Sequence, residues 1–207
     1  MKRCDWAGPE QIYIDYHDTD WGVPEYDSRA LWEKLILDGF QAGLSWITIL
    51  KKRENFREAF AGFDPNVIAD WGEADVERLL KNPGIIRHRG KIEATITNAR
   101  VWQDIERREG FDTYLWNFVG GAPVQNHYAT HGDVPTWTDT SKQISHDLKK
   151  HGFKFCGPTI VYAFMEAVGM VNDHLVSCHR HDAVAQMAVA KVAGSGPSLH
   201  HGARGAA

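Results

Sequence analysis

The spacing of apolar residues constrains this chain most, because it is helical along nearly the whole length and strand-like nowhere. No run of alternating polar and apolar residues is bounded by hairpin turns, and no internal repeat is present. These patterns indicate an all-α fold. We predict helices over residues 28–38, 45–60, 75–80, 92–108, 111–119, 141–150 and 158–168. Asp64-Pro65 predicts a further helix start, with aspartate as the cap and proline at the first helical position.

The chain has 207 residues, of which 43% are hydrophobic and 24% charged, as is typical of a globular protein with one core. We therefore expect a single domain over residues 1–180. From about residue 181 the sequence becomes rich in alanine, glycine, serine and histidine. Because such a composition buries little apolar surface, we predict a flexible tail over residues 181–207.

Nothing in the sequence indicates a membrane span. The longest apolar segment, residues 160–171, is interrupted by Glu166 and Gly169 and is too short to cross a bilayer. Three cysteines, an odd number, disfavour a disulfide scaffold. We expect a cytoplasmic protein, and a monomer, since no feature points to an oligomer.

Two pairs of metal-ligating residues stand at opposite ends of the sequence. Cys4 and His17 lie near the start, and His174 and Cys178 near the end. If residues 174–178 are helical, the side chains of His174 and Cys178 share one face. Two thiolates and two imidazoles make a tetrahedral zinc set that leaves no ligand position for water. The pattern therefore predicts one structural Zn²⁺ that joins the N-terminal segment to the C-terminal one.

Chance pairing is the alternative, since the chain has 11 histidines and its Cys/His spacing is not that of a zinc finger. His179 and His181 lie close enough to Cys178 to replace a ligand if the register differs. Cys156 stands in an apolar stretch, so we expect a buried thiol there rather than a further ligand.

The segment 81–92 places Pro83-Gly84 between two helical patterns, as in a helix–hairpin–helix, whose turn aims backbone N–H groups at a DNA phosphate. Residues 81–100 contain five Lys and Arg against one Glu, whereas the first 40 residues contain four against nine Asp and Glu. The overall charge of −4 thus hides a basic segment. A solvated connection between two helices is the alternative.

Aromatic residues crowd the first 21 positions, and Trp46 follows a Gly-Leu-Ser turn. Flat side chains gathered in one place stack a planar ligand such as a flipped purine, and an electron-rich cage favours a cationic base. Asp38 adds a carboxylate to the same wall. Ordinary core packing is the alternative for any one of these aromatic residues, namely Trp6, Tyr13, Tyr16, Trp21 and Trp46.

Five blocks of sequence together resemble the 3-methyladenine DNA glycosylase I family, in order and with similar spacing from Cys4 to Cys178. They are residues 16–25 (Tyr-His-Asp-x-x-Trp-Gly-Val-Pro-Glu), 41–48 (Gln-Ala-Gly-Leu-Ser-Trp-Ile-Thr), 51–55 (Lys-Lys-Arg-Glu-Asn), 84–92 (Gly-Ile-Ile-Arg-His-Arg-Gly-Lys-Ile) and 171–174 (Val-Asn-Asp-His).

The resemblance implies an α-helical fold of the helix–hairpin–helix glycosylase superfamily, with a zinc ion joining the termini. It also implies roles for individual residues. The zinc ligands fall on Cys4, His17, His174 and Cys178. The base pocket falls on Tyr16, Trp46 and the position of Asp38, surrounded by Trp6, Tyr13 and Trp21. The DNA contacts fall on the turn Gly43-Leu44 and on Gly84, Arg87, Arg89 and Lys91 of the hairpin.

The implied activity is repair of alkylated double-stranded DNA. The enzyme flips 3-methyladenine out of the duplex and hydrolyses its N-glycosyl bond, leaving an abasic site without a lyase step. Asp38 takes the catalytic position, where its charge favours a cationic base and the developing oxocarbenium ion. No separate catalytic aspartate is assigned.

Two positions depart from the family, which usually has glutamate where this chain has Asp38 and glutamine where it has Phe40. Aspartate keeps the charge but is one methylene shorter, so a direct contact to the base becomes weaker or water-mediated. One alternative is therefore a non-catalytic module that binds alkylation damage in DNA. Another is a hydrolytic zinc enzyme, which requires that one of the four ligands leave the metal.

Overall fold

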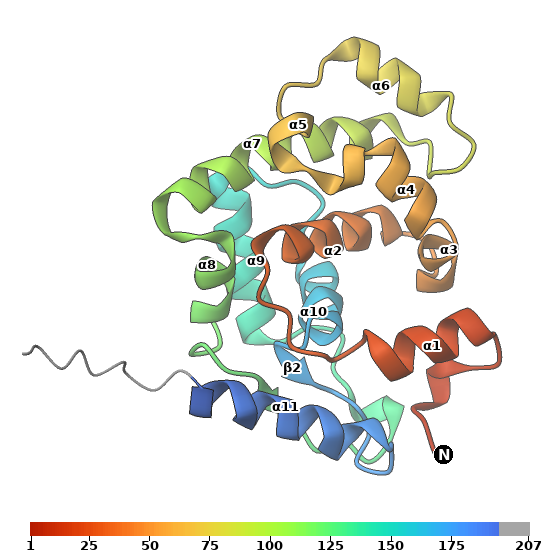
Figure 1. The fold of residues 1–207 in the computed structure, drawn as a ribbon, viewed down its shortest axis with the longest axis vertical. Coiled ribbons are helices and arrows are strands. Elements are labelled where there is room, and N and C mark those ends of the chain that lie inside the picture. The colour runs from red at the N-terminus through yellow and green to blue at the C-terminus, as the bar shows by residue number, and fades with distance from the viewer. Residues whose placement is uncertain (195–207) are drawn as a thin grey trace, which may run out of the picture.

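The computed structural model describes residues 1–194, and its regular structure is almost entirely helical (Figure 1). This confirms the fold class predicted from the apolar periodicity. The exception is a parallel pair of two-residue strands, β1 (Val124–Gln125) and β2 (Val171–Asn172). Two residues are too few to produce a visible alternation, so the sequence gives no signal for them.

The N-terminal half contains eight helical segments, of which two are short 3₁₀ turns. The predicted helix over residues 45–60 is broken into two, with a turn at Lys51 and Lys52. The first α-helix was not predicted. The segments are η1 (Asp5–Ala7), α1 (Gln11–Thr19), α2 (Ser28–Gln41), α3 (Trp46–Leu50), α4 (Arg53–Ala59), η2 (Ala61–Phe63), α5 (Pro65–Ile68) and α6 (Glu73–Leu80).

Capping residues fix where these helices begin. The carboxylate of Asp27 accepts the N–H groups of Arg29 and Ala30 at 3.0 and 2.8 Å, which satisfies two otherwise unpaired donors of α2. At α5, the Asp64 carboxylate accepts from the N–H of Asn66 at 2.9 Å, and Pro65 takes the first helical position, as the Asp-Pro pair predicts.

The C-terminal half continues with a long helix, a helical pair and the segment that closes the chain. Its elements are α7 (Arg89–Glu109), α8 (Phe111–Asn117), η3 (His131–Asp133), α9 (Asp139–His151), α10 (Pro158–Ala167) and α11 (Arg180–Gly194).

Helix α2 is the centre of the fold, with α10, α7, α8 and α3 packed around it (Figure 1). It is buried on several sides, as its side chains Leu31, Trp32, Leu37 and Phe40 show, each at most 1% exposed. A polar residue on such a helix has little access to solvent unless a cavity reaches it. Asp38 is in this position.

The predicted tail over residues 181–207 begins as a helix instead. Helix α11 runs to Gly194, and His181 and Val184 on its first turns are buried. The alanine-rich sequence has high helix propensity, and Val184 gives it one apolar contact with the body of the protein. Residues 195–207 lie outside the described part of the chain.

The N-terminal segment lies beside the start of α11 (Figure 1). The backbone N–H of His179 donates to the carbonyl of Lys2 at 3.0 Å, which ties the two ends of the domain together. Within residues 1–194 no helix is both long and apolar enough to cross a membrane.

Candidate active site and metal centre

A cavity of about 260 Å³ lies where α1, the C-terminal half of α2, the start of α3 and α10 meet. Every residue that the sequence assigned to the base pocket lines it: Trp6, Tyr13, Tyr16, Trp21, Asp38 and Trp46. The structure thus brings together residues from four separate segments of the chain. Sequence reasoning missed four further lining residues that carry polar groups, namely Lys34, Gln41, His131 and Glu166.

The aromatic residues of the cavity pack on one another as well as facing it. The Trp6 ring lies 5.1 Å from that of Tyr13 and 4.9 Å from that of Trp21, between ring centroids. Tyr16 lies 5.4 Å from Trp46. Their tilted and edge-on arrangements are those that aromatic quadrupoles favour, so the cavity wall is held in shape before any ligand enters.

Asp38 is 1% exposed and forms an ion pair with Lys34, one turn earlier on α2. The Lys34 Nζ lies 2.5 Å from Asp38 Oδ1 and 3.9 Å from the centre of the Trp46 ring. Burial raises the pKa of Asp38 and lowers that of Lys34, while the ion pair opposes both shifts. The carboxylate therefore does not face the cavity as a lone charge. The i, i+4 spacing of the two residues was the signal in the sequence.

The second oxygen of that carboxylate lacks a hydrogen-bond partner among the described residues. Within residues 1–194, Asp38 Oδ2 is buried without a hydrogen bond, and so is the indole Nε1 of Trp46. Buried polar atoms in folded proteins are almost always paired, so two orphans beside one cavity are unusual. One is an acceptor and the other a donor, and both are positions where a bound molecule would complete a hydrogen bond.

Glu166 brings a second carboxyl group to the cavity, from α10. Burial raises its pKa well above the usual range, and the neighbouring Asp173 raises it further. Asp173 accepts from Tyr162 Oη at 2.6 Å and Asn126 Nδ2 at 2.7 Å. Burial raises the pKa of Asp173 too, while these two hydrogen bonds oppose that shift. A lone glutamate inside an apolar helix was the signal for Glu166 in the sequence.

Cys4, His17, His174 and Cys178 form a buried cluster whose ligating atoms all lie within 4.8 Å of one another. Cys178 Sγ lies 3.4 Å from His17 Nε2 and 3.6 Å from His174 Nδ1, and Cys4 Sγ lies 3.7 Å from His174 Nδ1. A hydrogen bond with Cys4, and then those from the two imidazoles, lower the pKa of Cys178. The set could hold a metal ion.

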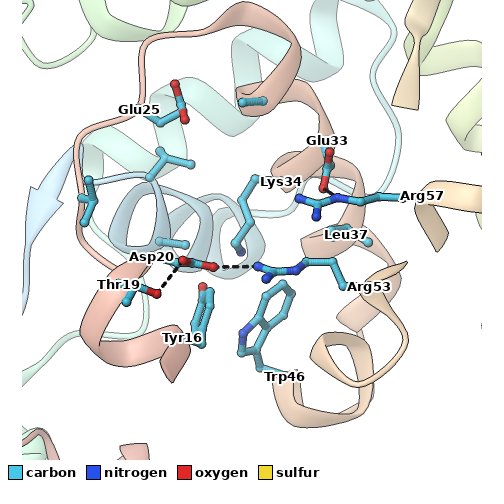
Figure 2. Close-up of a pocket in the computed structure, with 14 residues that line it drawn as sticks. Tyr16, Thr19, Asp20, Glu25, Glu33, Lys34, Leu37, Trp46, Arg53 and Arg57 are labelled. Atoms are coloured by element: carbon cyan, nitrogen blue, oxygen red, sulfur yellow. Dashed lines mark hydrogen bonds and ion pairs between the residues drawn. The ribbon is translucent and has the colours of Figure 1, made fainter. Parts of the chain in front are cut away.

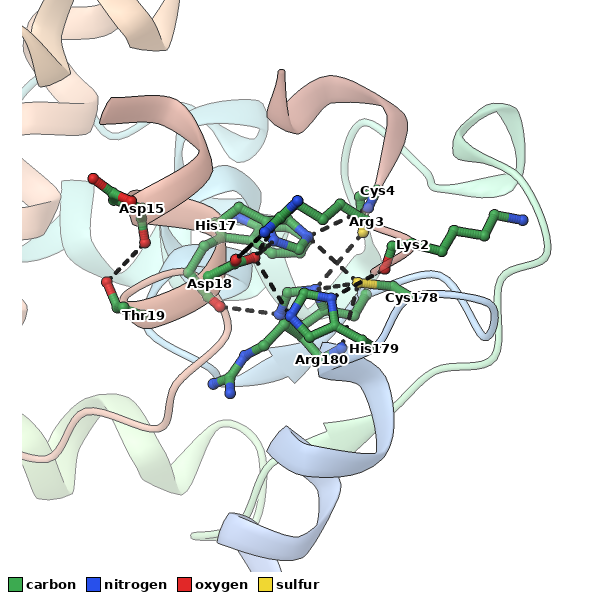
Figure 3. A network of polar contacts seen from close by, with 12 residues as sticks. Lys2, Arg3, Cys4, Asp15, His17, Asp18, Thr19, Cys178, His179 and Arg180 are labelled. Atoms are coloured by element: carbon green, nitrogen blue, oxygen red, sulfur yellow. Dashed lines mark hydrogen bonds and ion pairs between the residues drawn. The ribbon is translucent and has the colours of Figure 1, made fainter. Parts of the chain in front are cut away.

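Residues around the cluster orient both imidazoles. The Nδ1 of His17 pairs with the Asp18 carboxylate at 2.8 Å, and Arg3 binds the same carboxylate with contacts of 2.7 to 3.0 Å (Figure 3). The Nε2 of His174 pairs with the carbonyl of Trp21 at 3.1 Å. Each ring therefore turns its other nitrogen inward, as in histidines that bind metals.

Residues 174–178 do not meet the condition of being helical, because the segment is a turn in which Cys178 N–H donates to the Leu175 carbonyl at 2.7 Å. The turn still directs His174 and Cys178 to one point. His179 instead binds the Lys2 carbonyl. His181 binds the Asn126 carbonyl and Asp182. Cys156 is 1% exposed, which confirms a buried thiol.

The hairpin over residues 81–88 joins α6 to α7. The N–H of Gly84 donates to the Asn82 side chain at 2.8 Å, and Lys52 donates to the carbonyls of Pro83 and Gly84 at 3.2 and 3.3 Å. Ile85 is buried beneath the turn. The turn is thus fixed on the body of the protein from both sides.

The three basic residues of the hairpin have different surroundings. Arg87 is exposed and has no polar partner among the described residues. Arg89 is exposed too, but it pairs with Glu73, Glu77 and Glu93.

Lys91 is buried, 6% exposed, and donates to the carbonyls of Phe40 and Ala42, both at 2.8 Å. The prediction that Lys91 contacts DNA is therefore corrected, because its ammonium is committed to the end of α2.

The turn before α3 presents an apolar tip. Gly43 has φ of +82°, which favours glycine, and a Cβ there would meet nothing within 4 Å. Leu44 next to it is 41% exposed. An exposed leucine at the tip of a turn beside the cavity is free to insert into another molecule.

Comparisons with known proteins agree with one another. The family model for methyladenine glycosylase matches residues 6–181. DNA-3-methyladenine glycosylase 1 from Escherichia coli is 52% identical over 179 residues, which are 86% of this chain and 96% of the relative.

Solved structures give the same result. A crystal structure of 3-methyladenine DNA glycosylase I superposes with a TM-score of 0.86 and 55% identity, covering 87% of this chain and 100% of the other. A structure of the Staphylococcus aureus 3-methyladenine DNA glycosylase I, determined to explain 3-methyladenine recognition, superposes with a TM-score of 0.85 and 42% identity, covering 87% and 97%. This chain belongs to the methyladenine glycosylase family.

Proposed function

We propose that this chain is a DNA glycosylase that removes 3-methyladenine from alkylated double-stranded DNA by hydrolysis of the N-glycosyl bond. The observation that carries the proposal is the aromatic cavity lined by Asp38, whose Oδ2 is buried without a hydrogen-bond partner among the described residues. Such a cavity suits a planar base with an N–H group to offer. The Staphylococcus aureus relative, whose structure concerns 3-methyladenine recognition, supports the choice of this base.

In the proposed mechanism the damaged nucleotide leaves the duplex and its base enters the cavity, where it stacks on Trp46. Unstacking costs a few kcal/mol and least for a damaged base. Methylation at N3 gives the base a positive charge, so it departs readily with the bonding electron pair. Asp38 accepts a hydrogen bond from the base and stabilises positive charge nearby.

Water then completes the reaction. The bond between C1′ and the base nitrogen breaks, water adds to C1′ and loses a proton, and an abasic site remains. The reaction needs no covalent bond between enzyme and sugar, so we propose hydrolysis without strand cleavage. Lys34, which the sequence reasoning did not place in the cavity, is held by Asp38 as an ammonium.

We propose that Cys4, His17, His174 and Cys178 hold one Zn²⁺. A tetrahedral zinc with bonds of about 2.3 Å to sulfur and about 2.05 Å to nitrogen places sulfur and nitrogen about 3.6 Å apart. The three sulfur–nitrogen distances of 3.4 to 3.7 Å support that fit. When bound, the ion supplies a structural link between the chain ends, since four protein ligands leave no position for water.

For DNA binding we propose the Gly43-Leu44 turn, the Gly84 hairpin and Arg87. Leu44 would fill the gap that the flipped nucleotide leaves, and Gly84 would let the hairpin backbone approach a phosphate. Arg87 would neutralise one phosphate charge. We further propose that Arg89 contributes little, because three carboxylates already surround it. The domain that does this work is the one over residues 1–180, acting as a monomer.

A base-release assay tests the proposal. Duplex DNA treated with a methylating agent is incubated with the zinc-loaded protein, and free bases are separated by chromatography. Wild type should release 3-methyladenine, Asp38→Ala should release it at least tenfold more slowly, and Asp38→Glu should retain activity because it restores the longer carboxylate of the family. If wild type binds damaged DNA but releases no base, the alternative of a non-catalytic damage-binding module replaces the proposal.

A further inference from the structure

The loop between α9 and α10 presents an exposed aromatic ring beside the hairpin. We propose that Lys154 and Phe155, at the tip of this loop, are a further DNA-contacting element. The Phe155 ring stacks on a base that extrusion of the damaged nucleotide uncovers, and the Lys154 ammonium binds a backbone phosphate. The inference rests on the proposed function, which assigns DNA contacts to the Gly43-Leu44 turn and the hairpin.

The backbone of Phe155 has a conformation that large side chains rarely adopt. Its φ is +53°, in the left-handed region. Phe63 is the other aromatic residue with positive φ in the described part of the chain, and its ring is fully buried. The ring of Phe155 is 40% exposed, so core packing does not account for its strained backbone. Strain of this kind gathers at functional sites.

Two polar side chains fix the loop on either side of Phe155. The amide of Asn98, on α7, accepts from the Lys154 N–H at 2.8 Å and donates to the Lys154 carbonyl at 3.1 Å. The hydroxyl of Ser145, on α9, donates to the Cys156 carbonyl at 2.6 Å. The tip is thus held in place before DNA binds, so its binding costs little conformational entropy.

Phe155 is a neighbour of both elements that we propose for DNA binding. Its ring centroid lies 6.1 Å from that of His88, the residue that caps α7 at the end of the hairpin. On the other side, the Nζ of Lys91 lies 5.9 Å from the ring centroid of Phe155 and donates to the Ala42 carbonyl at 2.8 Å. Ala42 directly precedes the Gly43-Leu44 turn. The tip therefore extends a surface already proposed to face DNA.

Lys154 brings a positive charge that has no partner. Its side chain is exposed, and its ammonium makes no hydrogen bond or ion pair within residues 1–194. The two arginines of α4 differ in this respect, because both are paired with carboxylates (Figure 2). Arg53 lies 2.7 Å from Asp20, and Arg57 lies 2.7 Å from Glu33. Lys154 is free to bind a phosphate without first breaking an ion pair.

A ring next to an ammonium matches the chemistry of DNA from which a nucleotide has been extruded. In an intact duplex each base is covered by its neighbours, whereas extrusion uncovers the bases beside the gap. An aromatic face stacks on such a base whatever its identity, and an ammonium binds a phosphate of either duplex. The contact of Phe155 therefore depends on the gap, and that of Lys154 does not.

Binding to two duplexes tests the inference. One duplex is undamaged, and the other carries a tetrahydrofuran analogue of an abasic site, which leaves the neighbouring bases uncovered. Fluorescence anisotropy gives both affinities. Phe155→Asn removes the ring, and asparagine adopts positive φ more readily than phenylalanine, so the loop keeps its shape. Phe155→Tyr keeps the ring. Arg108→Met is the charge control for Lys154→Met, because Arg108 is exposed at the far end of α7, about 30 Å from His88.

Phe155→Asn should bind the abasic duplex roughly 5- to 150-fold more weakly than wild type, the range for loss of one base–aromatic stack. It should bind the undamaged duplex with nearly wild-type affinity, and Phe155→Tyr should bind both as wild type does. Lys154→Met should weaken binding to both duplexes by the same factor and lower the salt slope by about 1. Arg108→Met should leave the slope unchanged.

Two results overturn the stacking role. One is a folded Phe155→Asn that binds the abasic duplex as tightly as wild type does. The other is a loss of affinity in Phe155→Tyr as large as that in Phe155→Asn, which would make Phe155 a purely structural residue. An unchanged salt slope in Lys154→Met overturns the phosphate contact.

Binding of the free base separates this inference from the proposed function. In calorimetric titration with 3-methyladenine, the variants of Phe155 and Lys154 should match wild type, because neither residue lines the base cavity. A variant that loses affinity for the free base contradicts a role confined to DNA. If wild type releases no base from methylated DNA, the proposed function fails, yet the two duplexes still test the contacts of the tip.

Discussion

Replacing Lys91 by methionine tests whether this lysine contacts a DNA phosphate or stabilises the fold, two roles that the hairpin sequence leaves equally open. Lys91 stands in a basic run that suggests a phosphate contact, but in the structure it is buried. Its Nζ donates at 2.8 Å to the carbonyls of Phe40 and Ala42, at the end of α2. Carbonyls at the end of a helix have no partner within it. The ammonium supplies one, and it joins the hairpin to the turn that carries Leu44.

The expected cost follows from these contacts. A hydrogen bond with a charged partner contributes about 1.5–3 kcal/mol, and a buried carbonyl left unpaired costs about 1–3 kcal/mol. Phe40 is 1% exposed, so solvent does not reach its carbonyl to replace the lost hydrogen bond. Ala42 is only partly buried, so its carbonyl is more accessible to solvent. Burial also lowers the pKa of Lys91, because it desolvates the ammonium. Methionine carries no charge to desolvate, which offsets part of the loss in stability. The net loss is about 2–3 kcal/mol, within the 5–15 kcal/mol by which a typical domain is stable.

Two measurements test this estimate. Urea denaturation should show Lys91→Met destabilised by about 2–3 kcal/mol, and DNA binding followed against salt concentration should keep its wild-type slope. Arg87→Met is the matched control and should do the opposite. Its stability should stay within about 0.5 kcal/mol of wild type, while its salt slope falls by about 1. A Lys91→Met protein with unchanged stability and a slope reduced by about 1 would show that the ammonium contacts a phosphate after all.

Other predictions concern the thiols, the hairpin, the turn and the sugar. With metal bound, a thiol reagent should label no cysteine quickly. After a chelator removes the metal, Cys4 and Cys178 should react with the reagent. Cys156, whose pKa burial raises to about 11, should react only on unfolding. Arg89→Gln should change neither the salt slope nor, by more than about 1 kcal/mol, the stability, since exposed ion pairs contribute little. Leu44→Ala should preserve the melting temperature but slow base release from duplex DNA at least tenfold. Borohydride should trap no adduct between the protein and abasic DNA, as a band in gel electrophoresis would reveal.

Features of the fold that depend on local interactions could be predicted from the sequence. The helices follow from apolar spacing, and Asp64-Pro65 marks the start of α5 because capping involves only the next few residues. The break after Leu50 could not be seen, because both halves keep the same spacing. Helix α11 could not be predicted either, because its alanine-rich composition is compatible with a helix or a loop. What the sequence does not show is that Val184 is buried in the folded protein.

The candidate site divides in the same way. Residue types and spacing predicted which aromatic residues and which Cys and His side chains come together, because the proposed chemistry needs those types wherever the chain places them. The basic run was misleading, since what a charge does depends on distant partners. Lys91 meets carbonyls about 50 positions away, and Arg89 meets two glutamates of α6. Lys34 and Glu166 were missed because their signals, an i, i+4 pairing with Asp38 and a lone glutamate in an apolar helix, do not show that a cavity forms beside them.

The candidate metal cluster and the aromatic cavity share a wall, so a metal held by the cluster would also support the cavity. The Trp21 carbonyl pairs with His174, its ring lies 4.6 Å from that imidazole, and the same ring lines the cavity. Trp6 likewise contacts His17 at 5.2 Å and lines the cavity beside Tyr13. A short N-terminal segment buries too little apolar surface to hold such rings by itself. A metal that tied it to residues 174–178 would fix the rings, and with them the shape of the cavity, without itself contacting a bound base.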